Sequence, residues 1–435
     1  KMSNTVQLHA ARDARIQVLR NFGFEIRTRT TQTGEYVIAS LFNLVQLLRH
    51  HPQFKDRARY DEYSNECQWQ NEDGVWQRIK DLHVDQIRYT CEDMWGVAFS
   101  PANTWSSVGI VAMENKVNPV QEYFESLVGK WDPKKGSKAS KLLSHYMNAE
   151  DTKLHKAFSV RWLVSIVARA YATLEDPVIA HAMLVLYGAQ GIGKSTALRT
   201  LALSHKFKHR YFGDADLDMS RYKEAVQSIQ GKMIYELQEL AKRTKDVEIE
   251  KAFLSRLEDD VRLPFKRANE QIVRRAAFAR SVNRKNVNTD ASGSRRFWFV
   301  DLGDKKIKIA ELSRDLDDIW AEAVYYYKAG VQWFLTDEEE ELRIKAAEEF
   351  TDGHPLTDAV LKAANKLAGD SLLLPVTVTQ IIEELYESDD NRHLDKQTRK
   401  NQAIINDILI AAGWRYARRN HPYDKTKRIR GWWHK

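Results

Sequence analysis

The segment "AMLVLYGAQGIGKSTALRTLAL", residues 182 to 203, decides the fold class of this chain. It begins with six mostly apolar residues, typical of a buried strand, and it ends with the apolar spacing of a helix. Between them lies a loop with three glycines in six residues, followed directly by a lysine and a hydroxyl. This order predicts a strand, a phosphate-binding loop and a helix N-terminus.

The glycine-rich loop predicts a nucleotide site. Glycines let backbone N–H groups approach a β-phosphate at places where side chains would clash. Lys194 is expected to reach the β- and γ-phosphates, and the Ser195 hydroxyl is expected to hold Mg²⁺. ATP and Mg²⁺ are therefore the expected cofactors. The expected cofactor-binding residues are Gly188, Gly191, Gly193, Lys194, Ser195 and Thr196.

A second apolar run ends in acids, which phosphate hydrolysis needs for Mg²⁺ and for the attacking water. In "GKMIYELQEL", residues 231 to 240, a short predicted strand leads into Glu236, and Glu239 follows three residues later. We assign Glu236 to the metal and its water and favour Glu239 as the base, with the reverse order left open. The alternative for either acid is a helix cap or an ion pair with Lys232.

Two further predicted strands add polar residues. "AAFARSVN", residues 276 to 283, ends at Asn283, an amide that can orient the attacking water. "DASGSRRFWFV", residues 290 to 300, places Arg295 and Arg296 before a strand that we expect to be parallel to the others. The arginines should then point toward a neighbouring subunit, where one of them, with Arg296 favoured, acts as a finger on its nucleotide. The alternative is a surface ion pair.

The composition of the whole chain sets outer limits. The 435 residues are 43% hydrophobic and carry a net charge of +7, which fits several globular domains and slightly favours a polyanionic partner. The two cysteines, Cys67 and Cys91, exclude a disulfide framework and fit a reducing cytoplasm. No apolar run reaches about eighteen residues, so we expect no membrane span. The start of the chain shows no secretory signal.

Shifts in sequence pattern divide the chain into four expected regions. Residues 1–115 form a mixed α/β region, and residues 116–181 are mainly helical. Residues 182–350 alternate strands and helices around a mainly parallel sheet, and residues 351–435 form a separate basic unit.

Three local patterns give more detailed expectations. "IASLFNLVQLLRHH" predicts a helix whose apolar stripe contains Leu41, Leu44, Leu47 and Leu48. Residues 132–141 predict an exposed basic loop or linker, and "AFSVRWLVSIVARAYATL" predicts a mostly apolar helix.

The order of these motifs resembles the virulence-associated protein E family of phage and mobile-element ATPases, within the superfamily 3 helicases of the AAA+ class. The resemblance covers about 116 to 350 and rests on "NPVQEYFESLVGKWD", "GAQGIGKST", "GKMIYELQEL", "KAFLSR", "DDVRLPF", "SGSRRFWFV" and "DDIWAEAVYYY". It implies an AAA+ P-loop ATPase core that acts on DNA in replication, as a ring hexamer. The chain departs from the family's usual "T-x-N" at "SVN", and we claim no primase activity, although family members often carry a primase domain upstream.

The same resemblance gives a role to "VRLPFKRANEQIVRRAAFA", residues 261 to 279, which predicts a strand, a polar turn and a strand. In helicases of this class, a hairpin at this place projects into the ring channel. Lys266 and Arg267 at the tip would then hold a DNA phosphate. The alternative is a solvated surface hairpin.

The C-terminal unit predicts a winged-helix-like domain. "VTVTQIIEELYES" and "TRKNQAIINDILIAAGW" predict two amphipathic helices, and "RYARRNHPYDKTKRIRGWWHK" predicts a β-hairpin. Residues 391–435 hold twelve Lys or Arg against three acids, which favours contact with DNA phosphates. Trp432 and Trp433 either stack on bases or belong to the core of the unit. Its expected DNA-binding residues are Arg418, Arg419, Lys427, Arg428 and Arg430.

Together these patterns predict an ATP-driven DNA helicase or translocase of a phage or mobile element, assembled as a ring oligomer. An alternative is a DNA-binding ATPase switch that remodels an origin or senses invading DNA without unwinding it. A small-molecule P-loop kinase is disfavoured, because a kinase needs a lid and an acceptor pocket, where this chain has paired arginines and a basic tail.

Overall fold

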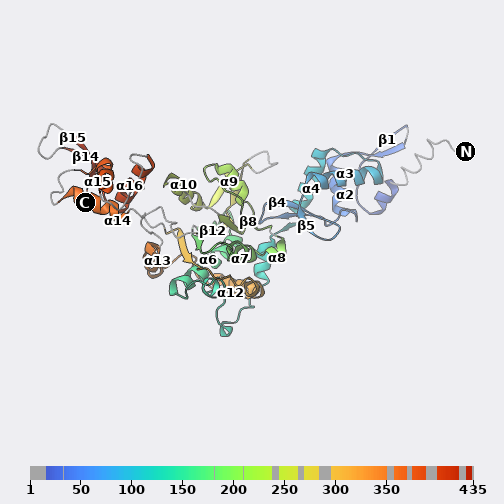
Figure 1. The fold of residues 1–435 in the computed structure, drawn as a ribbon. Coiled ribbons are helices and arrows are strands. Elements are labelled where there is room, and N and C mark those ends of the chain that lie inside the picture. The colour runs from blue at the N-terminus through green and yellow to red at the C-terminus, as the bar shows by residue number, and fades with distance from the viewer. Residues whose placement is uncertain are drawn as a thin grey trace.

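The computed structural model describes residues 16–32, 34–180, 182–208, 210–237, 244–262, 269–283, 295–349, 357–369, 375–387, 399–420 and 428–433. Figure 1 shows a central group of strands and helices, with the N-terminal elements on one side and the C-terminal elements on the other.

The centre of the molecule is a five-stranded parallel sheet with the strand order β13-β7-β12-β9-β8. Its strands are β7 (Met183–Tyr187), β8 (Phe212–Gly213), β9 (Ile234–Leu237), β12 (Ala277–Val282) and β13 (Phe297–Asp301). The sheet therefore confirms the prediction of parallel strands, including the strand that follows the paired arginines. Counted along the chain, its first strand lies between the fifth and the fourth.

Helices cover both faces of this sheet, because alternate residues of each strand point to opposite sides. Leu184 of β7 packs in a core with α6, α7 and α12, whereas Met183 packs on the other side with α9 and α10. The helices of this region are α6 (Lys153–Tyr171), α7 (Lys194–Leu201), α8 (Ser204–Phe207), α9 (Tyr222–Ile229), α10 (Thr244–Leu254), α11 (Ile309–Arg314), α12 (Leu316–Lys328) and α13 (Asp337–Glu349).

The segment before α6 packs into the same core as the sheet. It contains β6 (Lys116–Val117), α5 (Pro119–Glu125), the 3-10 turn η1 (Pro133–Lys135) and the π-helical turn η2 (Leu142–Tyr146). The buried carboxylate of Glu322 on α12 accepts hydrogen bonds from the Ser137 hydroxyl and from the N–H groups of Lys138 and Ala139, the last two at 2.8 Å. The exposed basic loop or linker predicted over 132–141 is a loop, but its second half is not fully exposed, since a buried acid holds that backbone.

The N-terminal region has its own core around a second sheet, ordered β5-β4-β3-β6. Its helix over "LFNLVQLLRH" is confirmed, with Leu44, Leu47 and Leu48 buried, but Leu41 is 38% exposed because it occupies the first position of the helix. The remaining elements are β1 (Thr28–Thr31), β2 (Gly34–Val37), α2 (Leu41–His50), β3 (Ala58–Asp61), β4 (Glu66–Gln70), β5 (Trp76–Arg78), α3 (Asp81–Trp95) and α4 (Pro101–Glu114).

Buried polar contacts join the N-terminal sheet to the central sheet. The fully buried Asp61 accepts the Tyr211 hydroxyl at 3.0 Å and the Gln68 amide at 2.7 Å. Tyr63 stacks edge-on against Tyr211 with ring centroids 5.2 Å apart. A side chain at Gly231 would lie 2.6 Å from the Cβ of Ser64, so the two backbones approach closely there. These contacts fix the two sheets relative to each other.

The C-terminal unit has a separate apolar core. Its helices are α14 (Thr357–Ala368), α15 (Val378–Glu387) and α16 (Arg399–Ala411), and its hairpin pairs β14 (Arg415–Asn420) with β15 (Arg428–Trp433). The two predicted helices and the predicted hairpin are confirmed, and α14 is an additional helix. A bridge between Val376 and Trp432 ties the hairpin to the segment before α15.

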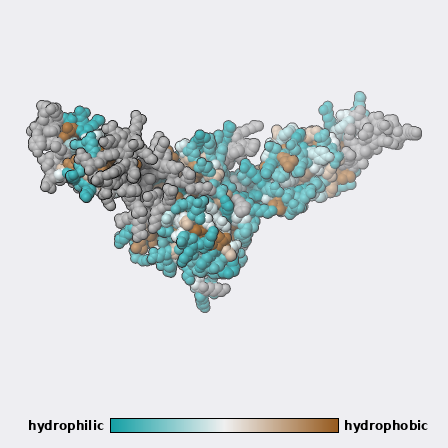
Figure 2. All heavy atoms as spheres, viewed as in Figure 1, coloured by the Kyte–Doolittle hydropathy of each residue, from teal (hydrophilic) through white to brown (hydrophobic). Residues whose placement is uncertain are grey.

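The surface seen in Figure 2 is mainly hydrophilic over the described residues, with isolated hydrophobic residues. None of the described helices combines the length and the apolarity that crossing a bilayer requires. Cys91 is buried, and burial raises the pKa of its thiol to about 12.

Candidate nucleotide-binding site

The glycine-rich loop joins the carboxyl end of β7 to the N-terminus of α7. A side chain at Gly188 would lie 2.8 Å from the Ile192 side chain and 2.9 Å from the Gly303 carbonyl oxygen, so only glycine fits there. Gly193 has a φ of +105° and caps α7, a conformation that other residues rarely adopt. The predicted strand, loop and helix are all present, and the loop has the glycines where its path requires them.

The ammonium group of Lys194 lies inside this loop. It donates to the carbonyl oxygens of Gly188 at 2.7 Å and Ala189 at 2.9 Å, and to the side-chain oxygen of Asn283 at 3.1 Å. Burial lowers the pKa of Lys194, and the negative charge of Glu236 opposes that shift. The loop and Asn283 together accept from the three donors of the lysine.

Glu236 lies on the face of β9 that α7 covers. Ile234, two residues earlier, packs in the same core as α7, and a strand repeats its side every two residues. The Ser195 hydroxyl of α7 donates to Glu236 Oε1 at 2.7 Å, and the Ser281 hydroxyl of β12 donates to the same oxygen. Lys232, the alternative partner considered for this acid, instead donates to the Arg210 carbonyl oxygen.

The second carboxylate oxygen of Glu236 is buried and has no hydrogen-bond partner among the described residues. A Mg²⁺ ion bound with phosphates needs only one or two protein oxygens. An orphaned carboxylate oxygen beside a serine hydroxyl fits that need. The described residues contain no cluster of three or more His, Cys, Asp or Glu side chains that would suit other metals.

Asn283 and Ser281 reach the site from β12, the strand beside β7 and β9. Asn283 is exposed and contacts Lys194, and Ser281 contacts Glu236. Thr196, a further predicted ligand, is exposed in the first turn of α7. The structure therefore brings Lys194, Ser195, Glu236 and Asn283 together at one edge of the sheet, where ligands of open α/β sheets bind. The sequence reasoning missed Ser281, although its position two residues before Asn283 placed it on the same side of the strand.

The segment after β13 supports the loop from the other side. Gly303 accepts the Ala189 N–H at 3.0 Å, and the Lys306 ammonium donates to the Gly191 carbonyl oxygen at 2.7 Å. The Ile192 carbonyl oxygen accepts the N–H of Ile307 at 2.9 Å. Lys306 is a second cation on the loop, and the sequence could not identify it without knowing that β13 is the neighbour of β7.

Arg295 and Arg296 lie at the opposite edge of the sheet, immediately before β13. The Arg296 carbonyl oxygen accepts the Met183 N–H at the start of β7, and its guanidinium donates to the Ser255 hydroxyl at 2.8 Å. Arg295 is exposed, and its side chain makes no ion pair with a described residue. The two arginines therefore lie at the amino end of β13, whereas their own glycine-rich loop lies at the carboxyl end of β7. Of the two side chains, that of Arg296 makes the contact within its own chain.

Several predicted residues lie outside the described ones: Glu239, the hairpin tip with Lys266 and Arg267, and Lys427. The stem of that hairpin is present, because β10 (Glu258–Val261) pairs antiparallel with β11 (Glu270–Val273). Its base is anchored by a buried ion pair between Arg274 and Asp259.

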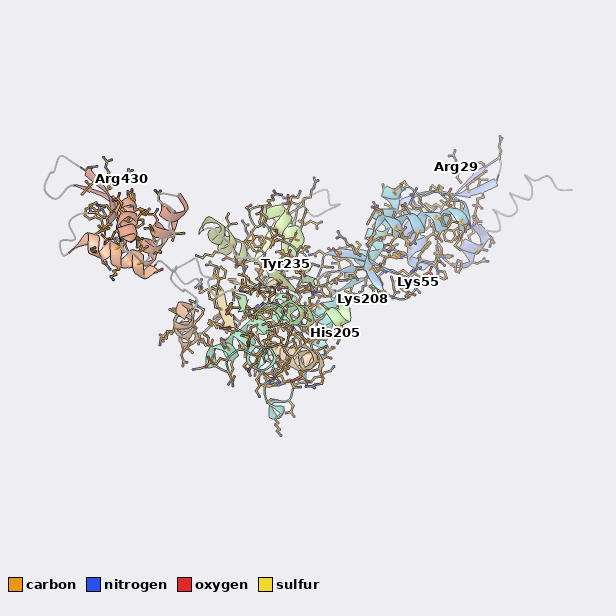
Figure 3. The ribbon with its side chains drawn as sticks, viewed as in Figure 1. Arg29, Lys55, His205, Lys208, Tyr235 and Arg430 are labelled. Carbon is orange, nitrogen blue, oxygen red and sulfur yellow. The ribbon has the colours of Figure 1, made fainter. Side chains whose placement is uncertain are left out.

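The C-terminal hairpin presents arginines on one face. Arg418 lies directly opposite Arg430 in the antiparallel register, and Arg428 lies opposite Asn420, so these side chains share a face. Arg418, Arg428 and Arg430 are exposed, and Arg430 is labelled in Figure 3; the side chain of Arg419 lies outside the described residues. We call Arg418, Arg428 and Arg430 the wing arginines.

Both tryptophans of this hairpin belong to the interior. Trp432 is 4% exposed in the core of the unit and donates to Asn406, and Trp433 is 5% exposed and donates to the Ala417 carbonyl oxygen. The alternative in which they stack on bases is therefore wrong for this structure, because the helices and the strand cover their rings.

Comparison with known proteins adds a family match. The model of the virulence-associated protein E-like domain matches residues 124–352, more than half of the chain. No curated protein matches the chain significantly. Among solved structures, an A-form apo structure of the NrS-1 C-terminal region is 11% identical with a TM-score of 0.40, covering 86% of this chain and 95% of that chain. A second A-form apo structure of that region is 12% identical with a TM-score of 0.39 and the same coverage.

Proposed function

The chain belongs to the virulence-associated protein E-like family, and from that premise we propose that it is an ATP-dependent DNA helicase or translocase of AAA+ type. It acts in the replication of a phage or mobile element, as a ring oligomer. The observation that carries this proposal is the convergence of Lys194, Ser195, Glu236 and Asn283 from three segments of the chain, the start of α7, β9 and the end of β12.

The proposed nucleotide is ATP with Mg²⁺, held over the glycine-rich loop. Mg²⁺ supplies positive charge to the phosphates and to the transferring group. Ser195 and the orphaned oxygen of Glu236 are the ligands that this chain offers to the ion. The N–H groups at the start of α7 face the phosphates and add the positive end of the helix dipole.

Each remaining residue has a separate role in this proposal. Lys194 exchanges the loop carbonyl oxygens for phosphate oxygens, and the loss of these two hydrogen bonds is offset because a charged phosphate is a stronger acceptor than a carbonyl group. Asn283 then loses its lysine contact and is available to orient a water molecule. Glu236, or Glu239, which lies outside the described residues, accepts the proton of that water.

The ring assembly is supported by the position of Arg295. It is exposed at the edge of the sheet opposite its own glycine-rich loop, where a neighbouring copy can supply a nucleotide. Arg296 is tied to Ser255 of its own chain, so the structure shifts our choice of finger from Arg296, which the sequence favoured, to Arg295. An arginine finger stabilises the charge of the transferring phosphoryl group.

The proposal is tested by measuring ATP hydrolysis with and without single-stranded DNA, strand displacement on a forked substrate, and particle mass with ATP. We expect hydrolysis that DNA stimulates, displacement of one strand, and a mass several times that of one chain. Absence of hydrolysis by the folded protein overturns the proposal. DNA-stimulated hydrolysis without displacement supports an ATPase switch instead.

A further inference from the structure

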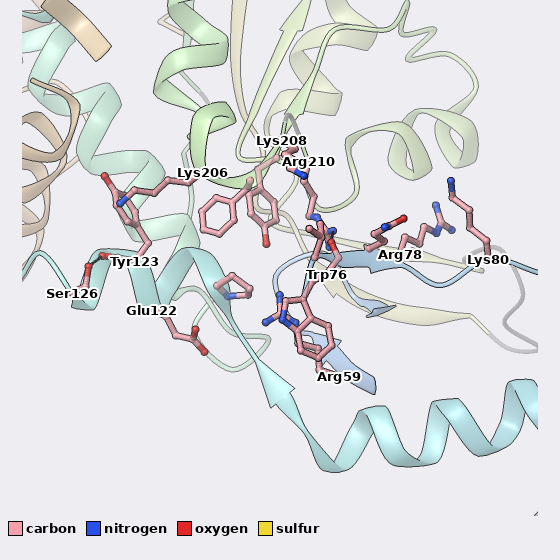
Figure 4. Close-up of a pocket in the computed structure, with 15 residues that line it drawn as sticks. Arg59, Trp76, Arg78, Lys80, Glu122, Tyr123, Ser126, Lys206, Lys208 and Arg210 are labelled. Atoms are coloured by element: carbon pink, nitrogen blue, oxygen red, sulfur yellow. Dashed lines mark hydrogen bonds between the residues drawn. The ribbon is translucent and has the colours of Figure 1, made fainter. Parts of the chain in front are cut away.

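An open cleft with a volume of about 900 Å³ lies where the N-terminal sheet meets the segment leading into β8. One wall is formed by β5 with Arg59 of β3, the second by α5, and the third by residues 206–211 (Figure 4). None of its lining residues belongs to the nucleotide site, and the labels of Lys208 and Arg430 in Figure 3 show that it lies apart from the wing arginines.

The lining of this cleft is strongly basic. Among its fifteen lining residues only Glu122 is acidic. The six cations are Arg59, Arg78, Lys80, Lys206, Lys208 and Arg210. In Figure 4 they extend along the cleft from α8 to the residues after β5 and do not converge on one point.

Few of these cations have an anionic partner in the described part of the chain. Arg78 lies 3.3 Å from Glu66, and Lys206 lies 3.6 Å from Asp317. The other four cations make no ion pair there. Arg210 donates to the Trp76 carbonyl oxygen at 2.7 Å, and its Nη1 atom is buried without a hydrogen-bond partner.

Two of the cleft cations also act on a partly buried lysine behind the cleft. Burial lowers the pKa of Lys232, which donates to the Arg210 carbonyl oxygen, and the charges of Arg210 and Arg78 add to that shift. The negative charges of Glu66 and Asp214 oppose it. A bound polyanion would offset the repulsion between these groups.

The walls of the cleft are held together, so its cations keep a fixed spacing. Two contacts join the wall that carries β5 to the wall that contains Tyr211: the Tyr211 hydroxyl donates to Asp61, and Arg210 donates to the Trp76 carbonyl oxygen. Trp76 is half-buried and carries the Arg59 guanidinium 4.0 Å from its ring centroid. A flat ring with an adjacent guanidinium is a surface on which an unpaired base can stack.

We propose that this cleft binds the backbone of single-stranded DNA, as a contact separate from the hairpin tip and the wing arginines. The extended row of cations matches successive phosphates, whereas a small anion would require cations that converge. Arg59, Trp76 and Arg210 line the cleft and are only partly exposed, and Trp76 offers a ring for an unpaired base, which favours a single strand over a duplex whose bases are already paired. The inference rests on the proposed function for the identity of the polyanion.

The test uses the double variant Lys80→Glu/Lys208→Glu in the full chain. Both residues are exposed and neither makes a described ion pair, so the exchange leaves the packing intact. The matched control is Arg29→Glu/Lys134→Glu, which changes the net charge equally at exposed positions that do not line the cleft. Binding of a labelled oligothymidine strand is followed by anisotropy at several salt concentrations without nucleotide, and far-UV circular dichroism checks the fold.

We expect the cleft variant to weaken single-strand binding about tenfold or more and to reduce the salt slope by about 1.4, the value for two phosphate contacts. The control should keep both values. The inference is overturned if the cleft variant and the control bind the DNA strand with equal affinity and equal salt slope. It is also overturned if the cleft variant loses about tenfold in affinity for inorganic tripolyphosphate while its affinity for DNA is unchanged. The DNA-binding measurement contains no nucleotide, so it is independent of ATP hydrolysis. If the parent protein does not hydrolyse ATP but Lys80→Glu/Lys208→Glu still weakens its DNA binding, the proposed function is wrong and the inference about the cleft stands.

Discussion

The nucleotide site and the wing arginines differ in what their polar side chains contact. At the carboxyl edge of the central sheet, Lys194, Ser195 and Glu236 bind groups of the same chain and are buried or partly buried. On the C-terminal hairpin, Arg418 and Arg430 face solvent and lie opposite each other. The first arrangement is stable by itself and must exchange partners to bind a ligand. The wing arginines make no ion pair with a described residue, so an incoming anion would relieve the repulsion between them, and the two sites should respond differently to substitution.

The largest expected effect is that of Lys194→Ala. Loss of the buried ammonium of Lys194 should reduce ATP hydrolysis by about 10³-fold or more, because it removes the cation that the loop itself holds next to the proposed phosphate site. Steady-state phosphate release measures the effect. Lys306→Ala is the matched control, since it also removes an ammonium from a loop carbonyl oxygen, but an exposed one. An equal loss in both variants would assign the effect to loop shape and not to Lys194.

Substitution of Arg295 tests whether this exposed cation acts on the nucleotide of a neighbouring subunit. Arg295→Ala should lower hydrolysis by about 10³-fold, at the lower end of measured arginine fingers. Mixing it with Lys194→Ala should partly restore activity, because mixed rings contain interfaces with one intact loop and one intact finger. Arg296→Ala, which removes the contact to Ser255, should not complement Lys194→Ala in the same way. No recovery in mixtures shown to co-assemble would mean that Arg295 acts within its own chain.

Glu236→Gln is a more conservative substitution in the nucleotide site, whose polar groups bind one another. The amide keeps the oxygen that accepts Ser195 and Ser281 but loses the negative charge, so nucleotide binding should persist while hydrolysis falls about 10²-fold. Equilibrium binding of labelled ATP and single-turnover hydrolysis separate the two quantities. Glu239→Gln, measured in parallel, decides which acid is the base. Normal hydrolysis by both variants would remove the acidic strand from the mechanism.

The contrast also explains how far the sequence could predict the molecule. The loop and Asn283 were predictable because each follows an apolar strand, and Glu236 because it lies near the end of one; the carboxyl ends of parallel strands meet at one edge. Ser281 and Lys306 were not identified, since their roles depend on which strands are neighbours and on the two-residue alternation within β12.

The remaining errors have the same origin in tertiary packing. The segment around Ser137 looked like a linker because its own residues are polar and basic, but Glu322, nearly two hundred residues later, binds its backbone. Trp433 looked available for stacking, but the strand it pairs with covers it. The basic cleft was invisible in the sequence, because Arg59, Lys80 and Lys208 come together only when the two sheets meet.

The smallest expected effect belongs to the wing arginines. The sign of the change in Tm separates a role in DNA binding from a role in stabilising the hairpin. Arg418→Ala/Arg430→Ala should weaken DNA binding about tenfold and lower the salt slope by about 1.4 to 1.8, since two phosphate contacts are lost. The Tm should stay unchanged or rise slightly, because two like charges directly opposite each other on a hairpin are destabilising. The control Lys362→Ala/Arg415→Ala removes two exposed cations of the same unit that lie off this face, and its DNA binding should stay near that of the parent. Anisotropy titrations at several salt concentrations and thermal unfolding measure the two quantities. If the wing variant loses Tm while its binding slope stays at the parent value, the arginines stabilise the hairpin and do not contact DNA.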